Sequence, residues 1–285
     1  MYDVIIIGAG PGGMTAAIYA ARANLNVLMI EKGIYGGQMM NTSEIENYPS
    51  YKMISGQELS EEMYEHATSL GAKYTYGEVK EIETIHEKHH KVHCGKEVYE
   101  TKTVIIASGA TPRKADIIGE DEFGGRGVSY CAICDGAFFK NKELVVIGGG
   151  DSAVEEAVYL TKFADKVTVF HRKDKFSAQK VLQDRLFDND KIEVKFNSVT
   201  KEIKGDKSVQ SVVLEEDGVE KTFETNGVFV YVGMKPITDF VPVHLLNDRK
   251  YISTNEKMET SQKGIYAKWL FWRFKKIIRK HIQKK

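Results

Sequence analysis

A glycine-rich turn occurs twice in this chain, and this repetition constrains the fold more than any other feature. The two copies are Gly8-Ala9-Gly10-Pro11-Gly12-Gly13 and Gly148-Gly149-Gly150-Asp151-Ser152-Ala153. Each follows a short apolar run and opens a segment with helical character, as in the strand–turn–helix of a dinucleotide-binding unit. The sequence therefore predicts an α/β fold with two Rossmann-like dinucleotide-binding domains, each a parallel sheet with helices plus a small β-meander.

The first copy of the turn is followed by a strand that ends in an acid. The pattern predicts a strand, a helix and a second strand at residues 4–7, 14–22 and 27–30. Gly8 permits the turn, Gly10 lets the backbone approach a pyrophosphate, and Gly13 allows close helix–strand packing. The helix N-terminus offers N–H groups to phosphates. Glu31, 23 residues after Gly8, is placed to accept hydrogen bonds from a ribose 2′-OH.

The second copy is followed by a strand that ends in bases. Its strand, helix and strand are predicted at residues 144–147, 154–163 and 167–170. The residue 23 positions after Gly148 is His171, and Arg172 and Lys173 follow it. An acid suits a free ribose 2′-OH, whereas cations suit a 2′-phosphate. Alone, Arg172 and Lys173 could be a solvated strand end. Because they follow a second glycine-rich turn, they indicate an NADPH site. The first unit, in which Glu31 ends the second strand, indicates an FAD site.

Between the two turns lies Cys131-Ala132-Ile133-Cys134-Asp135. Two thiols three positions apart can close a small disulfide ring and exchange with a partner's disulfide through a thiolate. The alternatives are half of a zinc site or a structural disulfide. A zinc site would need a second ligand pair, and the sequence holds no other C-x-x-C. A dithiol between an FAD site and an NADPH site is typical of an electron-transfer enzyme.

The remaining elements follow from periodicity and turn residues. Helices are expected at residues 57–70 and 178–189, and strands within residues 73–101, 104–107 and 192–232. The first group of strands contains several possible metal ligands, namely His86, His89, His90, His93 and Cys94. Because nothing in the sequence gathers these side chains around one point, we expect a solvated hairpin there and no metal site.

Cysteine content and charge indicate where the protein works. Three cysteines in 285 residues, two of them in one C-x-x-C, fit a reducing cytosol and a redox role. The chain opens directly on a strand-like run, so no signal peptide is expected. Residues 268–285 carry eight Lys and Arg and no acid, leaving 32 basic against 40 acidic residues elsewhere. We expect a cytoplasmic protein, and we expect no nucleic-acid partner.

Taken in order, these motifs resemble those of the low-molecular-weight bacterial thioredoxin reductases. The resemblance runs from residue 1 to about residue 267 and rests on Gly8 to Gly13, Gly36-Gly37-Gln38, Cys131 to Phe139, Gly148 to Glu156, and His171-Arg172. It implies a homodimer that reduces the thioredoxin disulfide with NADPH, through FAD and the Cys131/Cys134 dithiol. A related alternative is a flavoprotein subunit that donates electrons to a peroxide-reducing partner, although that family normally carries an extra N-terminal redox domain.

The resemblance also implies roles for individual residues. Cys134 would face the flavin, Cys131 would attack the thioredoxin disulfide, and Asp135 would donate and accept protons. FAD would be held by Gly8, Gly10, Gly13, Glu31, Lys32, Gly36, Gly37, Gln38, Asn47 and Ala107. NADPH would be held by Gly149, Gly150, Asp151, Ser152, Glu155, His171, Arg172 and Lys173. The FAD-binding domain is expected at residues 1–112 and 241–285, and the NADPH-binding domain with the C-x-x-C at residues 113–240.

Two departures from the family pattern bear on the cofactors. Lys173 and Ser177 stand where the family usually has arginine, and lysine lacks the bidentate fork, yet we expect NADPH to be preferred over NADH. After Ala267 the family's glycine–aspartate strand end and long helix are replaced by residues 268–285. A shifted reading frame, a replacement tail with membrane-surface character and a tail that packs in place of the lost helix are all open. FAD binding is expected to be weakened, so a flavin-deficient, non-catalytic derivative is the alternative function.

Overall fold

The computed structural model describes residues 1–216 and 218–267. The chain divides into two compact units, one formed by Met1–Thr111 with the segment that begins at Pro236, and one formed by Pro112–Lys235. The first unit is discontinuous, because the chain leaves it after Thr111 and returns at Pro236. No helix within the described ranges is long and apolar enough to cross a membrane.

The first unit is organised by a seven-stranded sheet in the order β3-β2-β1-β6-β5-β4, with β17 pairing with β6. Strands β3, β2, β1, β6 and β17 pair in parallel, and β4, β5 and β6 form an antiparallel meander. The parallel part contains the β-α-β unit predicted from the first glycine-rich turn. The elements are β1 (Tyr2–Ile7), α1 (Pro11–Arg22), β2 (Val27–Glu31), η1 (Gly37–Asn41), α2 (Gly56–Ser69), β3 (Lys73–Tyr76), β4 (Val79–His86), β5 (His89–Cys94), β6 (Glu97–Ile106), η3 (Val243–Leu245) and β17 (Ile265–Ala267).

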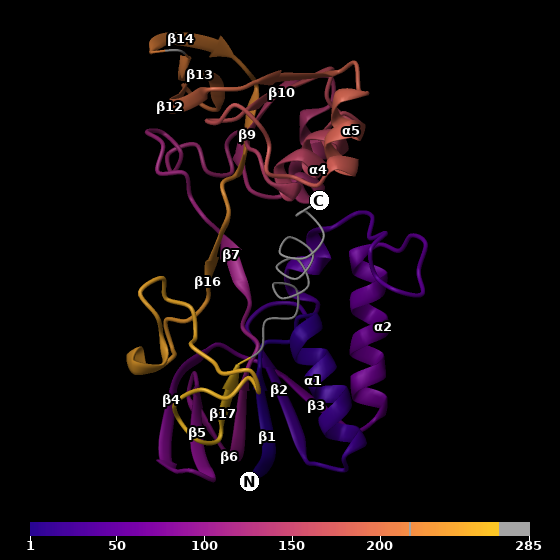
Figure 1. Cartoon of the computed structure of the whole chain (residues 1–285), viewed down its shortest axis with the longest axis vertical. Helices are drawn as coiled ribbons and strands as arrows, with labels where there is room; N and C mark the ends of the chain where they lie inside the picture. Colours follow the sequence, from indigo (N-terminus) through magenta and orange to yellow (C-terminus); the bar gives the residue numbers. More distant parts are fainter. Residues whose placement is uncertain (217, 268–285) are drawn as a thin grey trace, which may run out of the picture. The chain divides into compact units, whose positions relative to one another are not determined.

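Both faces of this sheet are covered. Successive side chains of a strand point to opposite faces, so Val4 and Ile6 pack with α1 and α2, whereas Ile5 and Ile7 pack with the meander. Helices α1 and α2 contact each other and lie on one side of the sheet (Figure 1). Because side chains on both faces of β1 are buried, its sequence over residues 4–7 is a continuous apolar run and does not alternate between apolar and polar residues.

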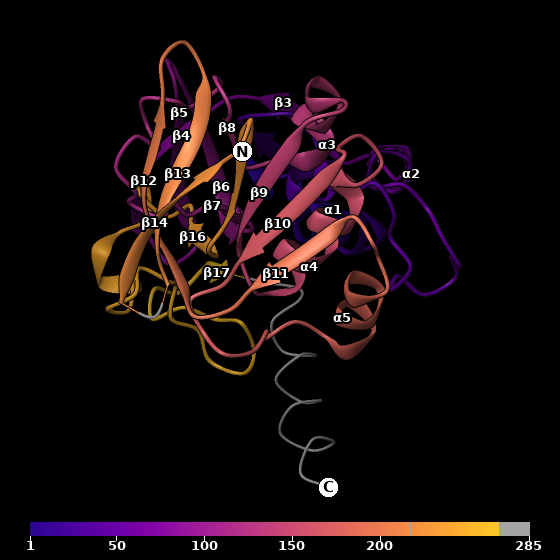
Figure 2. The ribbon, with the colours of Figure 1, turned by 90° about the horizontal axis from the view of Figure 1, so that it is seen from above.

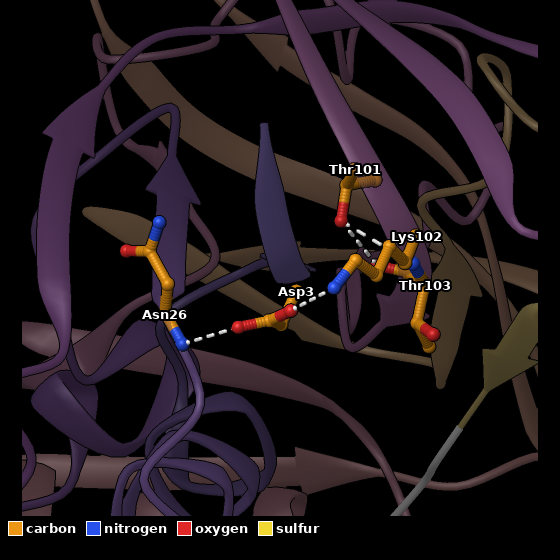
Figure 3. A network of polar contacts seen from close by, with 5 residues as sticks. All are labelled: Asp3, Asn26, Thr101, Lys102 and Thr103. Atoms are coloured by element: carbon orange, nitrogen blue, oxygen red, sulfur yellow. Dashed lines mark hydrogen bonds and ion pairs between the residues drawn. The ribbon is translucent and has the colours of Figure 1, made fainter.

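A polar network joins the edges of three neighbouring segments in the first unit (Figure 3). The carboxylate of Asp3 on β1 accepts hydrogen bonds from the backbone N–H of Asn26 at 2.9 Å and from Nζ of Lys102 on β6 at 2.7 Å. The bond from Lys102, followed by that from Asn26, holds the pKa of Asp3 below its usual range. Beside Lys102, the hydroxyl of Thr101 donates to the carbonyl of Thr103 at 2.9 Å. These contacts tie β1 to both of its neighbours.

The second unit contains a five-stranded parallel sheet in the order β11-β10-β9-β15-β8 and a three-stranded antiparallel sheet, β12-β13-β14. Strands β9, β10 and β11 lie side by side in Figure 2. The elements are β8 (Val128–Ser129), α3 (Ala132–Asp135), η2 (Gly136–Phe139), β9 (Glu143–Gly148), α4 (Asp151–Leu160), β10 (Lys166–Phe170), α5 (Lys180–Phe187), β11 (Ile192–Lys195), β12 (Ser198–Gly205), β13 (Val209–Glu216), β14 (Val219–Glu224) and β15 (Gly227–Tyr231).

The second unit repeats the layering of the first. Val146 on β9 packs in one cluster with residues of α4 and α5, including Leu160 and Leu186. Its neighbour Val145 packs in another cluster with Ile203 and other residues of the three-stranded sheet. The parallel sheet is therefore covered by helices on one face and by the small antiparallel sheet on the other, which is the predicted combination of parallel sheet, helices and meander.

The two segments that connect the units pair with each other. β7 (Ala110–Pro112) and β16 (Met234–Pro236) form a two-stranded sheet. The N–H of Arg113 donates to the carbonyl of Gly233 at 2.9 Å, and the N–H of Ile237 donates to the carbonyl of Gly109 at 3.1 Å. Both crossings of the chain are thus held in one hydrogen-bonded ribbon.

The histidine-rich hairpin differs from the expectation of a solvated surface element. His90 and Cys94 on β5 are buried, because alternate residues of this strand face the core of the meander. Nδ1 of His90 lies 3.0 Å from the hydroxyl of Thr84, and burial lowers the pKa of His90. The prediction of a solvated hairpin was wrong for these two residues. In the described ranges, no three His, Cys, Asp or Glu side chains are grouped so that they could hold a metal.

Candidate active site

The first glycine-rich turn connects the carboxyl end of β1 to the N-terminus of α1. Gly8 has a φ of +103°, which glycine adopts without the strain that a side chain would cause. A methyl group built at Gly13 would overlap the carbonyl oxygen of Gly8, and one built at Gly8 would overlap that of Ala107. The predicted residues Gly8, Gly13 and Ala107 therefore lie together, and glycine is what lets their backbones approach.

The carboxylate of Glu31 holds this turn to the end of β2. One oxygen accepts a hydrogen bond from the N–H of Ala9 at 2.8 Å, and the other accepts from the N–H of Gly33 at 2.9 Å. A carboxylate offers about four acceptor positions, so Glu31 keeps capacity for a ribose hydroxyl. The sequence suggested the ribose contact but not the two backbone bonds, which depend on the folded turn.

Gly10 lies where the turn meets the loop before η1. Among the described residues, only the carbonyl oxygen of Gly36 comes within 4 Å of a methyl group built at Gly10, at 3.9 Å. The N–H of Gly36 donates to the carbonyl of Ala9 at 2.8 Å, and Gly37 packs against Gly10. The N-cap residue of α1 is Gly10 itself, which has no side chain that could cap the helix, so N–H groups of the first turn can face a ligand. Open space at Gly10, available N–H groups and a nearby carboxylate fit the pyrophosphate and ribose of FAD.

Three of the predicted FAD-binding residues are exposed. Lys32 directly follows Glu31, Gln38 is in η1, and Asn47 is in the loop that precedes α2. The loop at Lys32 is packed through Tyr35, whose ring stacks on that of Tyr64 with centroids 4.1 Å apart.

The second glycine-rich turn joins β9 to α4 and repeats the geometry of the first. A methyl group built at Gly150 would have only the hydroxyl of Ser177, at 3.9 Å, within 4 Å in the described part of the chain. One built at Gly149 would overlap the ring of His171. The N-cap residue of α4 is Gly150 itself, which has no side chain that could cap the helix. Gly150 thus corresponds to Gly10, and the space beside it fits a second pyrophosphate.

The loop that follows β10 supports this second turn. The N–H and the hydroxyl of Ser177 both donate to the carbonyl of Gly149, at 2.8 and 3.1 Å. A carboxylate oxygen of Asp151 accepts from the N–H of Gln179 at 2.8 Å. In sequence, Ser177 was notable only as a missing arginine. In the structure it holds the glycine-rich turn against its neighbouring loop.

The basic cluster after β10 separates into a packed histidine and two exposed cations. The ring of His171 lies against Gly149 and packs with Phe176 at a centroid distance of 5.6 Å. Burial lowers the pKa of His171 despite a hydrogen bond to the carbonyl of Lys175. The imidazole is therefore neutral at pH 7, and the charge available for a 2′-phosphate lies on the exposed Arg172 and Lys173. The other predicted residues of this group, Ser152 and Glu155, are exposed on α4.

Cys131 and Cys134 are joined by a disulfide, with their Cα atoms 5.3 Å apart. Cys131 caps the N-terminus of α3, where its Sγ accepts a hydrogen bond from the N–H of Cys134 at 3.2 Å. After reduction the same N–H is placed to stabilise a thiolate on Cys131. Cys134 is exposed, and Cys131 is partly buried.

Asp135 is linked to the Cys pair through Ser129. The hydroxyl of Ser129 donates to the carboxylate of Asp135 at 2.6 Å and accepts from the N–H of Cys131 at 3.1 Å. This arrangement orients the carboxylate at the end of the helical turn that carries both cysteines. A group so placed can exchange protons with a thiol within one turn of chain.

Two further groups beside the Cys pair were not predicted from the sequence. The hydroxyl of Tyr231 accepts a hydrogen bond from the N–H of Ala132 at 2.9 Å. Oε2 of Glu156 is buried, with no hydrogen-bond partner among the described residues. Tyr231 is the last residue of a parallel strand, and ligands bind near the carboxyl ends of the strands in such sheets. Its position in the sequence could therefore have identified it as a candidate. Nothing in the sequence distinguishes Glu156 from Glu155 beside it.

The expectations about residues 268–285 lie outside the described residues. These are the replaced strand end of the FAD-binding domain, the basic membrane-surface tail and its packing in place of a helix.

The sequence matches a family described as "Pyridine nucleotide-disulphide oxidoreductase" over residues 2–268. It is 55% identical over 272 residues to a thioredoxin reductase of Bacillus subtilis, covering 94% of this chain and 85% of that protein. It is 44% identical over 269 residues to a thioredoxin reductase of Treponema pallidum, covering 93% of this chain and 87% of that protein.

Solved structures with the same fold include two thioredoxin reductases. The Lactococcus lactis enzyme, crystallised in its FR conformation, superimposes with a TM-score of 0.92 at 49% identity, covering 94% of this chain and 89% of that one. The T. acidophilum enzyme gives a TM-score of 0.90 at 35% identity with the same coverage.

Proposed function

The chain belongs to the pyridine nucleotide-disulphide oxidoreductase family, and on this premise we propose that it is a thioredoxin reductase. The reaction is the NADPH-dependent reduction of the thioredoxin disulfide, through FAD and the Cys131–Cys134 pair. Enzymes of that name in Bacillus subtilis and Lactococcus lactis support the proposal by their similarity. The observation that carries it is the Cys131–Cys134 disulfide on a helical turn of the second unit. The same unit contains the second glycine-rich turn and the basic residues that follow β10.

We assign FAD to the first unit and NADPH to the second. The support is the open space beside the backbone of Gly10 and of Gly150. Each of these glycines is the N-cap residue of a helix and has no side chain that could cap it. FAD is assigned to Gly8, Gly10, Gly13, Glu31, Lys32, Gly36, Gly37, Gln38, Asn47 and Ala107. NADPH is assigned to Gly149, Gly150, Asp151, Ser152, Glu155, His171, Arg172 and Lys173.

When bound, NADPH and FAD supply the hydride and the electron pair for disulfide reduction. The protein's own residues govern the dithiol chemistry that follows. Reduction breaks the Sγ–Sγ bond of the pair, with Cys134 as the sulfur that receives electrons. The N–H of Cys134 then stabilises a Cys131 thiolate, which attacks one sulfur of the thioredoxin disulfide; this S–S bond breaks and a mixed disulfide forms. Attack of the Cys134 thiol on Sγ of Cys131 restores the Cys131–Cys134 disulfide and releases thioredoxin with both thiols reduced. Asp135, oriented by Ser129, takes and returns the proton.

The proposal extends to the setting of the enzyme. We place it in the cytoplasm as a homodimer, with thioredoxin as its protein substrate. The support is a chain with three cysteines that carries one redox pair, together with the similarity to bacterial thioredoxin reductases.

The test is an absorbance spectrum of the purified protein, followed by NADPH-driven reduction of thioredoxin by wild type and Cys134→Ser. We expect flavin bands, a measurable flavin-to-protein ratio, and turnover that Cys134→Ser abolishes. A colourless protein without turnover would contradict the proposal and support a flavin-deficient derivative. Comparison of kcat/KM for NADPH and NADH tests the nucleotide, and equal values would contradict the role given to Arg172 and Lys173.

A further inference from the structure

The helical turn that carries the Cys pair rests directly on α4. Ala132, between the cysteines, is fully buried in the same cluster as Val154, Ala157 and Leu160. A methyl group built at Gly136, just after the motif, would lie 3.2 Å from the side chain of Leu160. Groups on the inner face of α4 are therefore next to the redox turn.

Tyr231 connects this turn to α4 from the end of β15. Its hydroxyl oxygen accepts the N–H of Ala132 at 2.9 Å. Burial, followed by the nearby carboxyl of Glu156, raises the pKa of Tyr231 well above its usual range, and Asp135 acts in the same direction. The phenol thus stays protonated, and it lies within the electrostatic reach of one carboxyl group on α4 and another on α3.

Glu156 on α4 has a carboxyl oxygen that solvent does not reach, and its carboxyl group lies within electrostatic range of this hydroxyl. Its Oε2 is shielded from solvent and makes no hydrogen bond to any described residue. Burial raises the pKa of the Glu156 carboxyl to about 8, and the negative charge of Glu155 on the same helix adds to the effect. Among the described residues, the titratable groups that act on Glu156 or on the Tyr231 hydroxyl beside it are Glu155 on α4 and Asp135 on α3.

We propose that the carboxyl group of Glu156, close to the Tyr231 hydroxyl and to the Cys131–Cys134 turn, holds a buried proton, and that the charge on Glu156 couples reduction of the disulfide to pH. This role rests on the proposed function, since it concerns the same dithiol. Glu156 and Tyr231 act as positioning residues, because neither contacts a reacting sulfur in the structure. Glu156 is held as a neutral acid, so no negative charge is added beside a newly formed thiolate.

The coupling follows from the charges on either side of the turn. Reduction by a dithiol reagent transfers two electrons to the pair, breaks the Sγ–Sγ bond and closes a disulfide in the reagent. The two protons released by the reagent go to the cysteines or to solvent. An ionised Glu156 repels the thiolate and disfavours the reduced pair. By linkage, reduction raises the proton affinity of Glu156 equally, so near its pKa Glu156 takes up an additional proton from solvent.

The experiment measures the equilibrium constant for reduction of the pair by dithiothreitol between pH 6 and pH 9.5. The full-length protein is equilibrated with defined ratios of reduced and oxidised reagent, quenched with acid and alkylated with a mass tag after unfolding. Cys94, the free cysteine, contributes one constant tag. Wild type is compared with Glu156→Gln and Tyr231→Phe. Glu143→Gln, an exposed carboxylate at the start of β9, is the matched control.

We expect equal constants for wild type and Glu156→Gln at pH 6.5. At pH 9.5 the constant of Glu156→Gln should be about tenfold higher, within the usual range of coupling between neighbouring sites. Tyr231→Phe keeps the carboxyl group but removes a polar hydroxyl from its surroundings, which makes ionisation of Glu156 less favourable. Its curve should therefore depart from that of Glu156→Gln at a higher pH than the wild-type curve does. Glu143→Gln should follow wild type throughout.

Coincident curves for wild type and Glu156→Gln would overturn the inference. If Glu156→Gln fails to fold, a Tyr231→Phe curve identical to that of wild type overturns it equally. The measurement needs no FAD, NADPH or thioredoxin. Diverging curves with no thioredoxin turnover would therefore contradict the proposed function alone, whereas full turnover with coincident curves would contradict only the coupling.

Discussion

At the scale of single residues, several side chains support the backbone around the nucleotide turns rather than only facing a ligand. Glu31 accepts hydrogen bonds from Ala9 and Gly33, and Ser177 donates to Gly149. The bonds to Ala9 and Gly149 each join a glycine-rich turn to a segment more than 20 residues away in the chain. Loss of such a side chain should therefore affect the stability of the turn as well as the affinity for a nucleotide.

Substitution of Glu31 by glutamine should lower the free energy of unfolding of the first unit even without FAD. One acceptor oxygen is replaced by an NH2 group, so either Ala9 or Gly33 loses its partner, at a cost of about 0.5–1.5 kcal/mol, the usual net contribution of one hydrogen bond. Urea unfolding of the flavin-free protein measures this. Glu61→Gln, an exposed carboxylate on α2, is the control. Equal stability of Glu31→Gln and wild type would show that the two backbone bonds contribute little.

His90 should make the first unit sensitive to acid. Its pKa is lowered in the folded protein, so the unfolded chain binds the proton more readily between the folded pKa and the ordinary value of about 6.5. The stability contribution is thus present above pH 6.5 and is lost as the pH falls through the folded pKa.

Urea unfolding at pH 7.5, 6.5 and 5.0 checks this expectation. The loss of stability on acidification should be smaller in His90→Gln than in wild type, whereas His66→Gln, an exposed histidine on α2, should lose as much as wild type. An identical pH dependence in His90→Gln and wild type would contradict the role of His90.

At the scale of elements, glycines of one turn serve two different purposes. Gly13 lets α1 start against the carbonyl of Gly8, which is a requirement of the fold. Gly10 has open space in place of a side chain, which we propose is needed for the approach of FAD. The fingerprint in the sequence does not separate these purposes, because both positions simply read as glycine.

The variants Gly10→Ala and Gly13→Ala should therefore differ. Gly13→Ala forces a methyl group onto a backbone oxygen and should destabilise the first unit by roughly 1–3 kcal/mol. Gly10→Ala should leave the flavin-free stability within about 1 kcal/mol of wild type but abolish retention of FAD. Urea unfolding and the flavin-to-protein ratio give the two readouts. A stable Gly13→Ala protein, or full flavin retention by Gly10→Ala, would contradict the assignment.

At the scale of the whole molecule, the two units have separate cores. Among the described residues, the clusters that contain Ile5 and Val4 consist of side chains of the first unit, and those that contain Val146 and Val145 consist of side chains of the second. The second unit is continuous in sequence, from Pro112 to Lys235, and carries the disulfide. A unit that has its own core and closed layers can fold alone.

Residues 112–235, expressed as a separate protein, should fold cooperatively and keep the Cys131–Cys134 disulfide. The physical reason is that both faces of its parallel sheet are covered by its own α4, α5 and antiparallel sheet. Urea unfolding followed by circular dichroism should give one sigmoidal transition, and alkylation should detect no free thiol before reduction. A fragment without a cooperative transition would mean that the second unit depends on the first.

The sequence by itself determined the repeated α/β units, because glycine spacing and apolar runs depend on local backbone geometry that is the same in every such turn. It also placed Cys131 and Cys134 within one turn, since a separation of three residues leaves little choice. Only the tertiary structure decided that His90 is buried and that Ser177 donates a hydrogen bond to Gly149. It also decided that Tyr231 bonds to Ala132 between the two cysteines and that an oxygen of Glu156 is buried. These contacts join positions distant in sequence, and they depend on strand order and on which face of an element turns inward, which single residue patterns do not encode.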